Sequence, residues 1–362
     1  MSETADILII GTGQFAARIL FDLAATVDAT TRIAVAGRNA ARLAWLETAG
    51  RARAHMFQRP VTIVGHRTEP ADLEQIADVL SRVRPSVVLQ AASLQSGAVI
   101  SMQNNAWSKL VAAGGLSASA IFQTVLSARV ARGCMKALPG VHFVNACFPD
   151  VTNSLIAAMG LPVTSGIGNI QILAHAFGGL LARTASADLK VLAHYQNLAV
   201  WRRPAAARHG ANARVWVDDK EEQDVLARFS DVRLTPEPVI DISGAAAAPL
   251  LLALAHRREW HGHVPGPGGL PGGYPVRTTA SGIVLDLPAG LTRDAAVRWN
   301  RAHEEASGLV VDDHGVAQYT GKLREELAAV SPDLSKGFHV RDLEAVFVAM
   351  QELRDRLLSQ PA

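Results

Sequence analysis

Residues Asp6–Ala16 of this 362-residue chain, DILIIGTGQFA, indicate its fold class most clearly. Its apolar run Ile7–Ile10 ends at Gly11, which is typical of a strand buried on both faces of a parallel sheet. The following residues, Gln14–Leu23, carry apolar side chains at helical spacing. The glycines are therefore predicted to lie on a turn between a strand and a helix.

The spacing of Gly11, Gly13 and Ala16 fits the G-x-G-x-x-A fingerprint of dinucleotide-binding domains. The first position makes a tight turn, the second lets a pyrophosphate approach the backbone, and the third permits close helix packing. A helix that begins near Gln14 also offers free N–H groups and a positive dipole end to phosphates. A plain tight turn is the alternative. Because the flanking pattern favours the dinucleotide, we expect Gly11, Gly13, Gln14, Phe15 and Ala16 to bind it.

Strands and helices keep alternating as far as residue 146. Further strands are predicted at 32–37, 61–65, 86–91 and 141–146, and helices at 39–49 (closed by Gly50), 69–83 and 117–137. Right-handed crossovers then make a doubly wound parallel sheet the expected topology. The fold class predicted for residues 1–150 is an α/β Rossmann domain.

The pattern changes after Pro149. Strands are predicted at 190–201, 214–217 and 282–287, which indicates an α+β second domain over residues 151–339. The segment 340–362 carries apolar residues at helical spacing, so we expect a C-terminal helix that packs back on the first domain. The second domain is thus predicted to be an insertion.

Composition excludes several classes of protein. With Lys+Arg 35 against Asp+Glu 33, no overall field would attract nucleic acid or an anionic membrane. Cys134 and Cys147 have neither disulfide-framework nor metal-ligand spacing, and His256, His261 and His263 lack completing ligands, so no metal site is expected. No signal peptide is expected at the N-terminus, and a cytoplasmic location is predicted.

The end of the second strand indicates which dinucleotide binds. Arg38 and Asn39 stand where an NAD-preferring site usually carries a carboxylate for the ribose hydroxyls. Arg38 can pair with a 2′-phosphate, with Arg42 one turn further along, and the expected cofactor is therefore NADP(H). A solvated arginine is the alternative. Ala92 and Ser93, after the fourth strand, are expected near the nicotinamide half.

Candidates for the chemistry lie near the ends of the predicted strands. His175, His194 and Tyr195 are expected to transfer protons, because histidine titrates near neutrality and tyrosine can donate within a relay. Asp150 follows the fifth strand and is expected to act as a base or to orient an ammonium group. Packed polar residues, and for Asp150 a cap on the helix from Val151, are the alternatives.

Other residues are expected to hold the substrate. Asn145 ends the fifth strand, and Asn169 lies in a turn that reaches the cleft. The Gly/Pro-rich segment 264–275 is predicted to be neither helix nor central strand. As a mobile lid it would place Tyr274 over the substrate, with Arg277 gripping a carboxylate. A solvent loop without a role is the alternative.

The combination of GTGQFAARI, AGRNAARL, VTIVG and PSVVLQAAS, within the first 100 residues or so, resembles the saccharopine dehydrogenase-like family of NADP-dependent oxidoreductases. The resemblance implies a Rossmann domain, an inserted α+β domain with substrate and dimer contacts, and hydride transfer at a carbon bonded to nitrogen. His66 and Arg67 depart from the family, where relatives often carry an aspartate near the adenine.

The function expected from the sequence is an NADP(H)-dependent oxidoreductase. It would reduce a C=N or C=O bond in a small, anionic metabolite and would form a homodimer. A non-catalytic NADP(H)-binding regulator is the alternative from another class. Dehydration or epimerisation with a tightly held nicotinamide is a third possibility.

Overall fold

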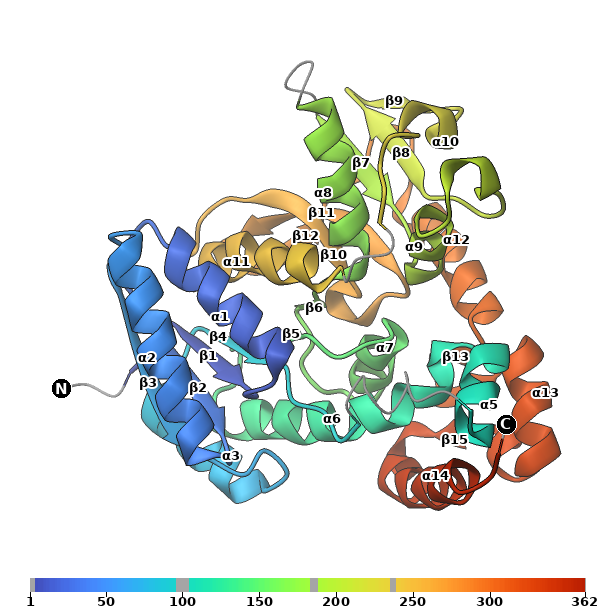
Figure 1. Ribbon diagram of the computed structural model, residues 1–362, viewed down its shortest axis with the longest axis horizontal. Helices are drawn as coiled ribbons and strands as arrows, with labels where there is room; N and C mark the ends of the chain where they lie inside the picture. Colours follow the sequence, from blue (N-terminus) through green and yellow to red (C-terminus); the bar gives the residue numbers. More distant parts are fainter. Residues whose placement is uncertain (1–3, 96–103, 183–187, 235–238, 362) are drawn as a thin grey trace.

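A six-stranded parallel sheet forms the centre of the computed structural model, which describes residues 4–95, 104–182, 188–234 and 239–361 (Figure 1). The strand order is β3-β2-β1-β4-β5-β6, the doubly wound order of a Rossmann domain. The strands are β1 (Ile7–Ile10), β2 (Thr31–Gly37), β3 (Val61–Arg67), β4 (Val87–Gln90), β5 (His142–Asn145) and β6 (Ser165–Gly166). The predicted fold class is thereby confirmed.

Strand β1 is the middle of the sheet because its side chains are apolar on both faces. Ile7 and Ile9 pack into a core with α1 and α11, whereas Leu8 and Ile10 pack into a second core with α3 and α6. Full burial of each such side chain contributes about 1.5–3 kcal/mol. The covering helices are α1 (Gln14–Thr26), α2 (Ala40–Met56), α3 (Leu73–Val83), α6 (Ala120–Ala137) and α11 (Ile240–His256). Helix α5 (Ala106–Gly114) packs into the same core as α6, at a greater distance from the sheet (Figure 1).

Three small antiparallel sheets contain the remaining strands of the described residues, as expected for an α+β part. They are β7-β8-β9 (Leu189–Leu192, Arg214–Val217, Lys220–Glu221), β10-β11-β12 (His261–Pro265, Gly273–Thr279, Gly282–Leu285) and β13-β14-β15 (Leu309–Val311, Val316–Tyr319, Phe338–His339). The helices of this part are α7 (Val151–Ala158), α8 (Asn169–Leu181), α9 (Tyr195–Trp201), α10 (Val225–Arg228), α12 (Arg293–Ala306), α13 (Gly321–Val330) and α14 (Leu343–Leu358).

The last helix returns to the first part of the chain. Helix α14 packs against α5 and α6, next to which the C-terminus lies (Figure 1). Helix α11, from the middle of the chain, packs along α1. The division of the chain at residues 150 and 339 stays a prediction.

Helix α2 is longer than the sequence pattern indicates. Gly50 was expected to close it, but the helix continues to Met56 with Gly50 buried inside it. A Cβ at Gly50 would stand 2.5 Å from Cδ1 of Ile63 on β3. The glycine therefore serves close packing of helix on strand and does not end the helix.

The strand predicted at 190–201 is wrong in its second half. Strand β7 ends at Leu192, and helix α9 begins at Tyr195. The side chain of His194 accepts a hydrogen bond from the amide of Gln196 and so caps the new helix. Trp201, fully buried, packs edge-on against Phe177 with ring centroids 4.8 Å apart. Capping and tertiary packing decide this segment where local propensity does not.

The Gly/Pro-rich segment 264–275 is also corrected, because it enters a sheet. Gly273, Tyr274 and Pro275 begin β11, which is the central strand of its sheet. Gly273 exchanges backbone hydrogen bonds with Ala193 in both directions, at 2.7 and 3.3 Å. Proline has no backbone N–H to donate, and at Pro275 the carbonyl oxygen accepts a hydrogen bond from the amide of Asp286.

Among the described residues, no helix has both the length and the apolar character needed to cross a bilayer.

Candidate functional site

A cavity of about 1270 Å³ opens at the carboxyl edge of the parallel sheet. One wall is built from the β1–α1 turn and the ends of β2, β4 and β5, and the other from α8, α9 and the ends of α12 and α13. Of the residues expected to bind the cofactor or the substrate or to act in catalysis, those that line it are Gly11, Gly13, Gln14, Phe15, Arg38, Ala92, Ser93, Asn169 and Tyr195.

The two glycines of the β1–α1 turn have different surroundings: Gly11 lies close to the backbone after β4, and Gly13 faces open space. At Gly11, with φ of +125°, a Cβ would stand 2.9 Å from the backbone of Ala91 and Ala92. A Cβ at Gly13 would meet nothing within 4 Å, although Gly13 lines the cavity. Ala16, only 2% exposed, packs its helix onto the sheet. The turn thus leaves free space against the main chain, which is what a diphosphate requires.

The start of α1 offers donors to that space. Gly13 provides no side-chain cap, and the first turn of α1 holds no acidic residue. The amides of Gln14 and Phe15 precede Ala17, whose amide is the first to donate within the helix, to the carbonyl oxygen of Gly13, so they are available to an anion. Nε of Arg42 donates to the carbonyl oxygen of Thr12 at 3.1 Å and fixes the turn from behind.

The end of β2 carries Arg38, which is predicted to bind a 2′-phosphate. The Arg38 side chain is 78% exposed, lines the cavity and lies 3.8 Å from a carboxylate oxygen of Glu69. Asn39 does not line the cavity; its side chain accepts from the amide of Arg42 at 2.9 Å and caps α2. Arg38 is therefore the residue at this strand end that is placed to meet a ligand.

The charge on the cavity wall is positive. Among the described lining residues, Arg38, Arg202 and Lys322 are basic, and no aspartate or glutamate is present. Lys322 is already paired with Glu325 and Glu326, at 3.3 and 2.9 Å. Such a lining favours anionic ligands.

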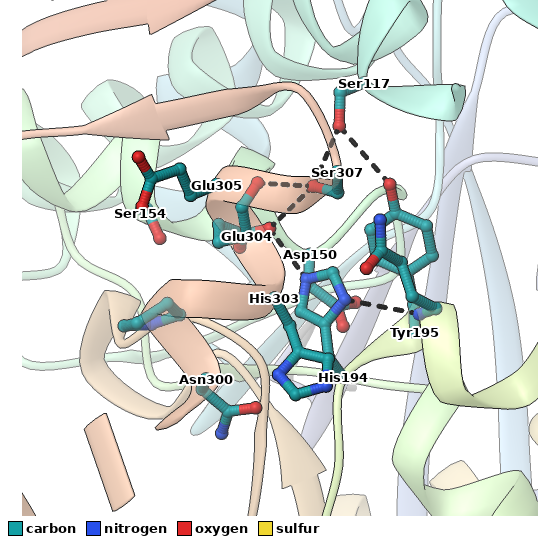
Figure 2. Close-up of polar contacts among 12 residues, drawn as sticks. Ser117, Asp150, Ser154, His194, Tyr195, Asn300, His303, Glu304, Glu305 and Ser307 are labelled. Carbon is teal, nitrogen blue, oxygen red and sulfur yellow. Dashed lines mark hydrogen bonds and ion pairs between the residues drawn. The ribbon is translucent and has the colours of Figure 1, made fainter. Parts of the chain in front are cut away.

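Tyr195 lies on the second wall, with its hydroxyl 3.3 Å from Oγ of Ser117 (Figure 2). Burial raises the pKa of Tyr195 to about 12. The phenol therefore stays protonated at neutral pH and can donate a hydrogen bond. Of the residues predicted from the sequence to act in catalysis, Tyr195 is the one that lines the cavity.

His194 lies behind Tyr195 and is fully buried. Its Nδ1 accepts from the Gln196 amide at 3.2 Å, and its Nε2 lies 2.8 Å from Oε2 of Glu304. Since Nδ1 acts as an acceptor, the ring proton sits on Nε2 and is donated to the carboxylate. Both ring nitrogens are used within the protein, so His194 positions its neighbours.

A chain of hydroxyls joins this buried pair to the cavity. Oγ of Ser307 lies 3.4 Å from Oε2 of Glu304 and 3.4 Å from Oγ of Ser117, which contacts Tyr195 (Figure 2). Ser307 itself lines the cavity, as Tyr195 does. The polar side chains therefore run continuously from the cavity wall to Glu304 and His194.

A second buried carboxyl group supports Asn169. Oδ1 of Asp150 accepts a hydrogen bond from Nδ2 of Asn169, while its Oδ2 has no partner among the described residues. Burial raises the pKa of Asp150 to about 6, with the nearby Glu304 adding to the rise and His194 opposing it. Asn169 lines the cavity and Asp150 does not. Asp150 therefore orients the amide and leaves its carbonyl oxygen free.

Four other predicted site residues lie outside the cavity. Asn145 is buried and donates to Thr152 and Asn153 at 3.0 and 2.9 Å, which fixes the turn after β5. His175 is an exposed residue of α8, and Arg277 an exposed residue of β11. The hydroxyl of Tyr274, which is fully buried, donates to the carbonyl oxygen of Pro271 at 2.7 Å. The structure does not bring these four residues to the cavity.

Sequence reasoning missed Arg202, Ser307 and Glu304. Arg202 follows Tyr195 by seven residues, which is two helical turns and places both on one helix face. Because a strand is predicted at 190–201, this helical spacing goes unrecognised in the sequence. Glu304 lies 110 residues from His194 along the chain, so no local pattern links them.

No family model matches the chain, and no curated protein matches it. Solved structures do. The chain is similar to malate dehydrogenase from Picrophilus torridus, solved in its apo form, with 14% identity, coverage of 84% of this chain and 96% of that one, and a TM-score of 0.56. It is also similar to lactate dehydrogenase from Cryptosporidium parvum complexed with lactic acid and b-nicotinamide adenine dinucleotide. That match has 15% identity, covers 85% of this chain and 98% of that one, and has a TM-score of 0.54.

Malate dehydrogenase from Archaeoglobus fulgidus in complex with NADH matches with 16% identity, coverage of 83% and 99%, and a TM-score of 0.52. None of these three structures is a saccharopine dehydrogenase, and that resemblance stays a prediction. At such low identity the likeness shows the fold, which is the dinucleotide-binding fold of these dehydrogenases.

Proposed function

We propose that this protein is an NADP(H)-dependent oxidoreductase that transfers hydride to a C=N or C=O bond of a small, anionic metabolite. The observation that carries the proposal is the single cavity that joins the open glycine turn at Gly13 to the hydroxyl of Tyr195. A dinucleotide spanning the sheet edge would have its diphosphate on the turn and its nicotinamide toward Ala92 and Ser93. The nicotinamide supplies the hydride when bound.

The similarly folded dehydrogenases support a nicotinamide cofactor. The lactate dehydrogenase from C. parvum was solved with nicotinamide adenine dinucleotide, and the malate dehydrogenase from A. fulgidus with NADH. The turn of the present chain has what such a cofactor needs, namely free main-chain donors and no side chain in the way. We carry the cofactor class over to this chain as part of the proposal.

The preference for NADP(H) rests on Arg38. Its guanidinium is exposed beside the cavity, and no carboxylate among the described lining residues is present to accept hydrogen bonds from ribose hydroxyls. A 2′-phosphate would form a charge-assisted pair with it. The ion pair with Glu69 is long and half-exposed, so it contributes little and yields to a phosphate.

The proton is assigned to Tyr195. A carbonyl or imine that accepts hydride gains negative charge on its oxygen or nitrogen, and a phenol that stays protonated can donate to that atom. The hydroxyls of Ser117 and Ser307 lie next to the phenol and would stabilise the phenolate left after transfer, which regains its proton from solvent through the cavity. Asn169 offers its carbonyl oxygen to an N–H donor.

The cofactor claim is tested by fluorescence titration with NADPH and NADH. Replacing Arg38 with Asp should weaken NADPH binding by about ten- to a hundredfold and leave NADH nearly unchanged. Arg298→Asp makes the same charge change on an exposed position of α12 outside the cavity and should alter neither affinity. Equal losses for both cofactors would remove the NADP(H) assignment.

Catalysis is tested with a panel of keto acids, alone and with ammonium or amino acids, by following NADPH oxidation. Tyr195→Phe should keep NADPH affinity and lose about a hundredfold or more in turnover. Binding of NADPH without oxidation by any member of the panel would count for the non-catalytic regulator instead.

A further inference from the structure

Helix α9 presents one continuous stripe of side chains to the cavity. The members of the stripe are Tyr195, Gln196, Leu198, Ala199 and Arg202. An α-helix rises about 1.5 Å per residue, so Tyr195 and Arg202 stand about 10 Å apart along the axis. The helix is held by Trp201, which is fully buried against Phe177. The backbone positions of the two polar ends of the stripe, Tyr195 and the C-cap residue Arg202, are therefore fixed about two helical turns apart.

Arg202 is the cation of the cavity that the protein itself leaves without a counter-ion. Within the described part of the chain, its exposed side chain has no ion pair and no hydrogen bond. Lys322 is neutralised by two glutamates of its own helix. Arg38 lies at the end of β2, the adenosine side of a Rossmann site.

The anionic groups of the cofactor already have donors elsewhere. The amides at the start of α1 suit the diphosphate, and Arg38 suits a 2′-phosphate. Arg202 comes from the opposite wall and shares its helix face with Tyr195. A third anion, one that belongs to the other reactant, is what this guanidinium is placed to bind.

We propose that Arg202 binds a carboxylate of the substrate, and that this carboxylate is several bonds away from the carbon that accepts hydride. The inference rests on the proposed function, in which Tyr195 marks the reacting end. A monocarboxylic 2-oxo acid such as pyruvate, whose single carboxylate is attached directly to the reacting carbon, has no remote carboxylate to offer to Arg202. The planar guanidinium would hold the remote carboxylate through two parallel hydrogen bonds.

The test is calorimetric titration of the NADP⁺-loaded protein, at low ionic strength, with 5-oxohexanoate and with pyruvate. Wild-type protein should bind 5-oxohexanoate more tightly than pyruvate. Arg202→Gln should weaken 5-oxohexanoate binding by about tenfold or more, the loss expected for one charge-assisted contact. Arg202→Lys should recover part of the affinity.

The adjacent Arg203 supplies a matched control. It lies outside the cavity, and its guanidinium donates to the carbonyl oxygen of His209 at 3.3 Å. Arg203→Gln should leave the binding of 5-oxohexanoate unchanged, and Arg202→Gln should leave NADPH affinity within about twofold of wild type.

Several outcomes would overturn the inference. They are an equal loss of 5-oxohexanoate binding in both glutamine variants, tighter binding of pyruvate, absence of 5-oxohexanoate binding by the wild type, and a loss of NADPH affinity in Arg202→Gln as large as the loss for the acid. Failure of the proposed function is distinct, because it appears as wild-type protein that binds no NADPH in the preceding fluorescence titration.

Discussion

The two walls of the cavity are built in different ways. The wall at the sheet edge consists mainly of backbone and small residues such as Gly11, Gly13 and Ala92. The wall at α9 consists of side chains, above all Tyr195 and Arg202, which stand in front of buried polar groups. We call the first the backbone wall and the second the side-chain wall. Substitutions behind the side-chain wall should mainly lower the free energy of unfolding, and substitutions in the backbone wall should mainly weaken cofactor binding.

The side-chain wall should be the more sensitive in stability. Glu304→Ala removes the carboxylate that accepts from His194 and should cost about 3–5 kcal/mol of unfolding free energy, the usual result of breaking a buried pair. Glu305→Ala, an exposed neighbour, should change it by less than about 0.5 kcal/mol. Urea denaturation measures both. Similar small losses for the two variants would show that the buried pair does not hold this wall.

The second carboxyl group of that wall should act through pH. The folded-state pKa of Asp150, about 6, lies above its ordinary value of 3.8. Folding therefore favours the protonated form, and its contribution to stability is present below pH 3.8 and is lost as pH rises through 6. Asp150→Asn should consequently stabilise the protein at pH 8, by up to about 3 kcal/mol, and little at pH 4.

Urea unfolding at both pH values checks this, with the exposed Asp313→Asn as the pH-independent control. An equal gain at pH 4 and pH 8 would contradict a raised pKa as the cause.

The backbone wall should respond in binding more than in folding. Gly13→Val fills the space of the diphosphate and should weaken NADPH binding about a hundredfold, roughly 2.7 kcal/mol. Its unfolding free energy should change by less than about 1 kcal/mol, because the new Cβ meets nothing within 4 Å. Gly179→Val also places its Cβ in open space, but outside the cavity, and should keep NADPH affinity. NADPH fluorescence and urea denaturation give the two readouts.

The same contrast explains what the sequence could predict. The alternation of strands and helices, the glycine turn and the place of Arg38 follow from local patterns, because strand, turn and helix are contiguous along the chain. The α9 wall depends on long-range events, such as the contact of His194 with Glu304 and the packing of Trp201 on Phe177. An apolar run such as 190–201 is compatible with strand or helix until those contacts form, and so Arg202 was overlooked.

The central claim, that the backbone wall holds NADP(H), is tested most directly by a crystal structure of the protein grown with NADP⁺. We expect the diphosphate to lie against the amides of Gln14 and Phe15 and the 2′-phosphate to lie within hydrogen-bonding distance of Arg38. Density for NADP⁺ at another place, or a glycine turn left empty at saturating NADP⁺, would contradict it.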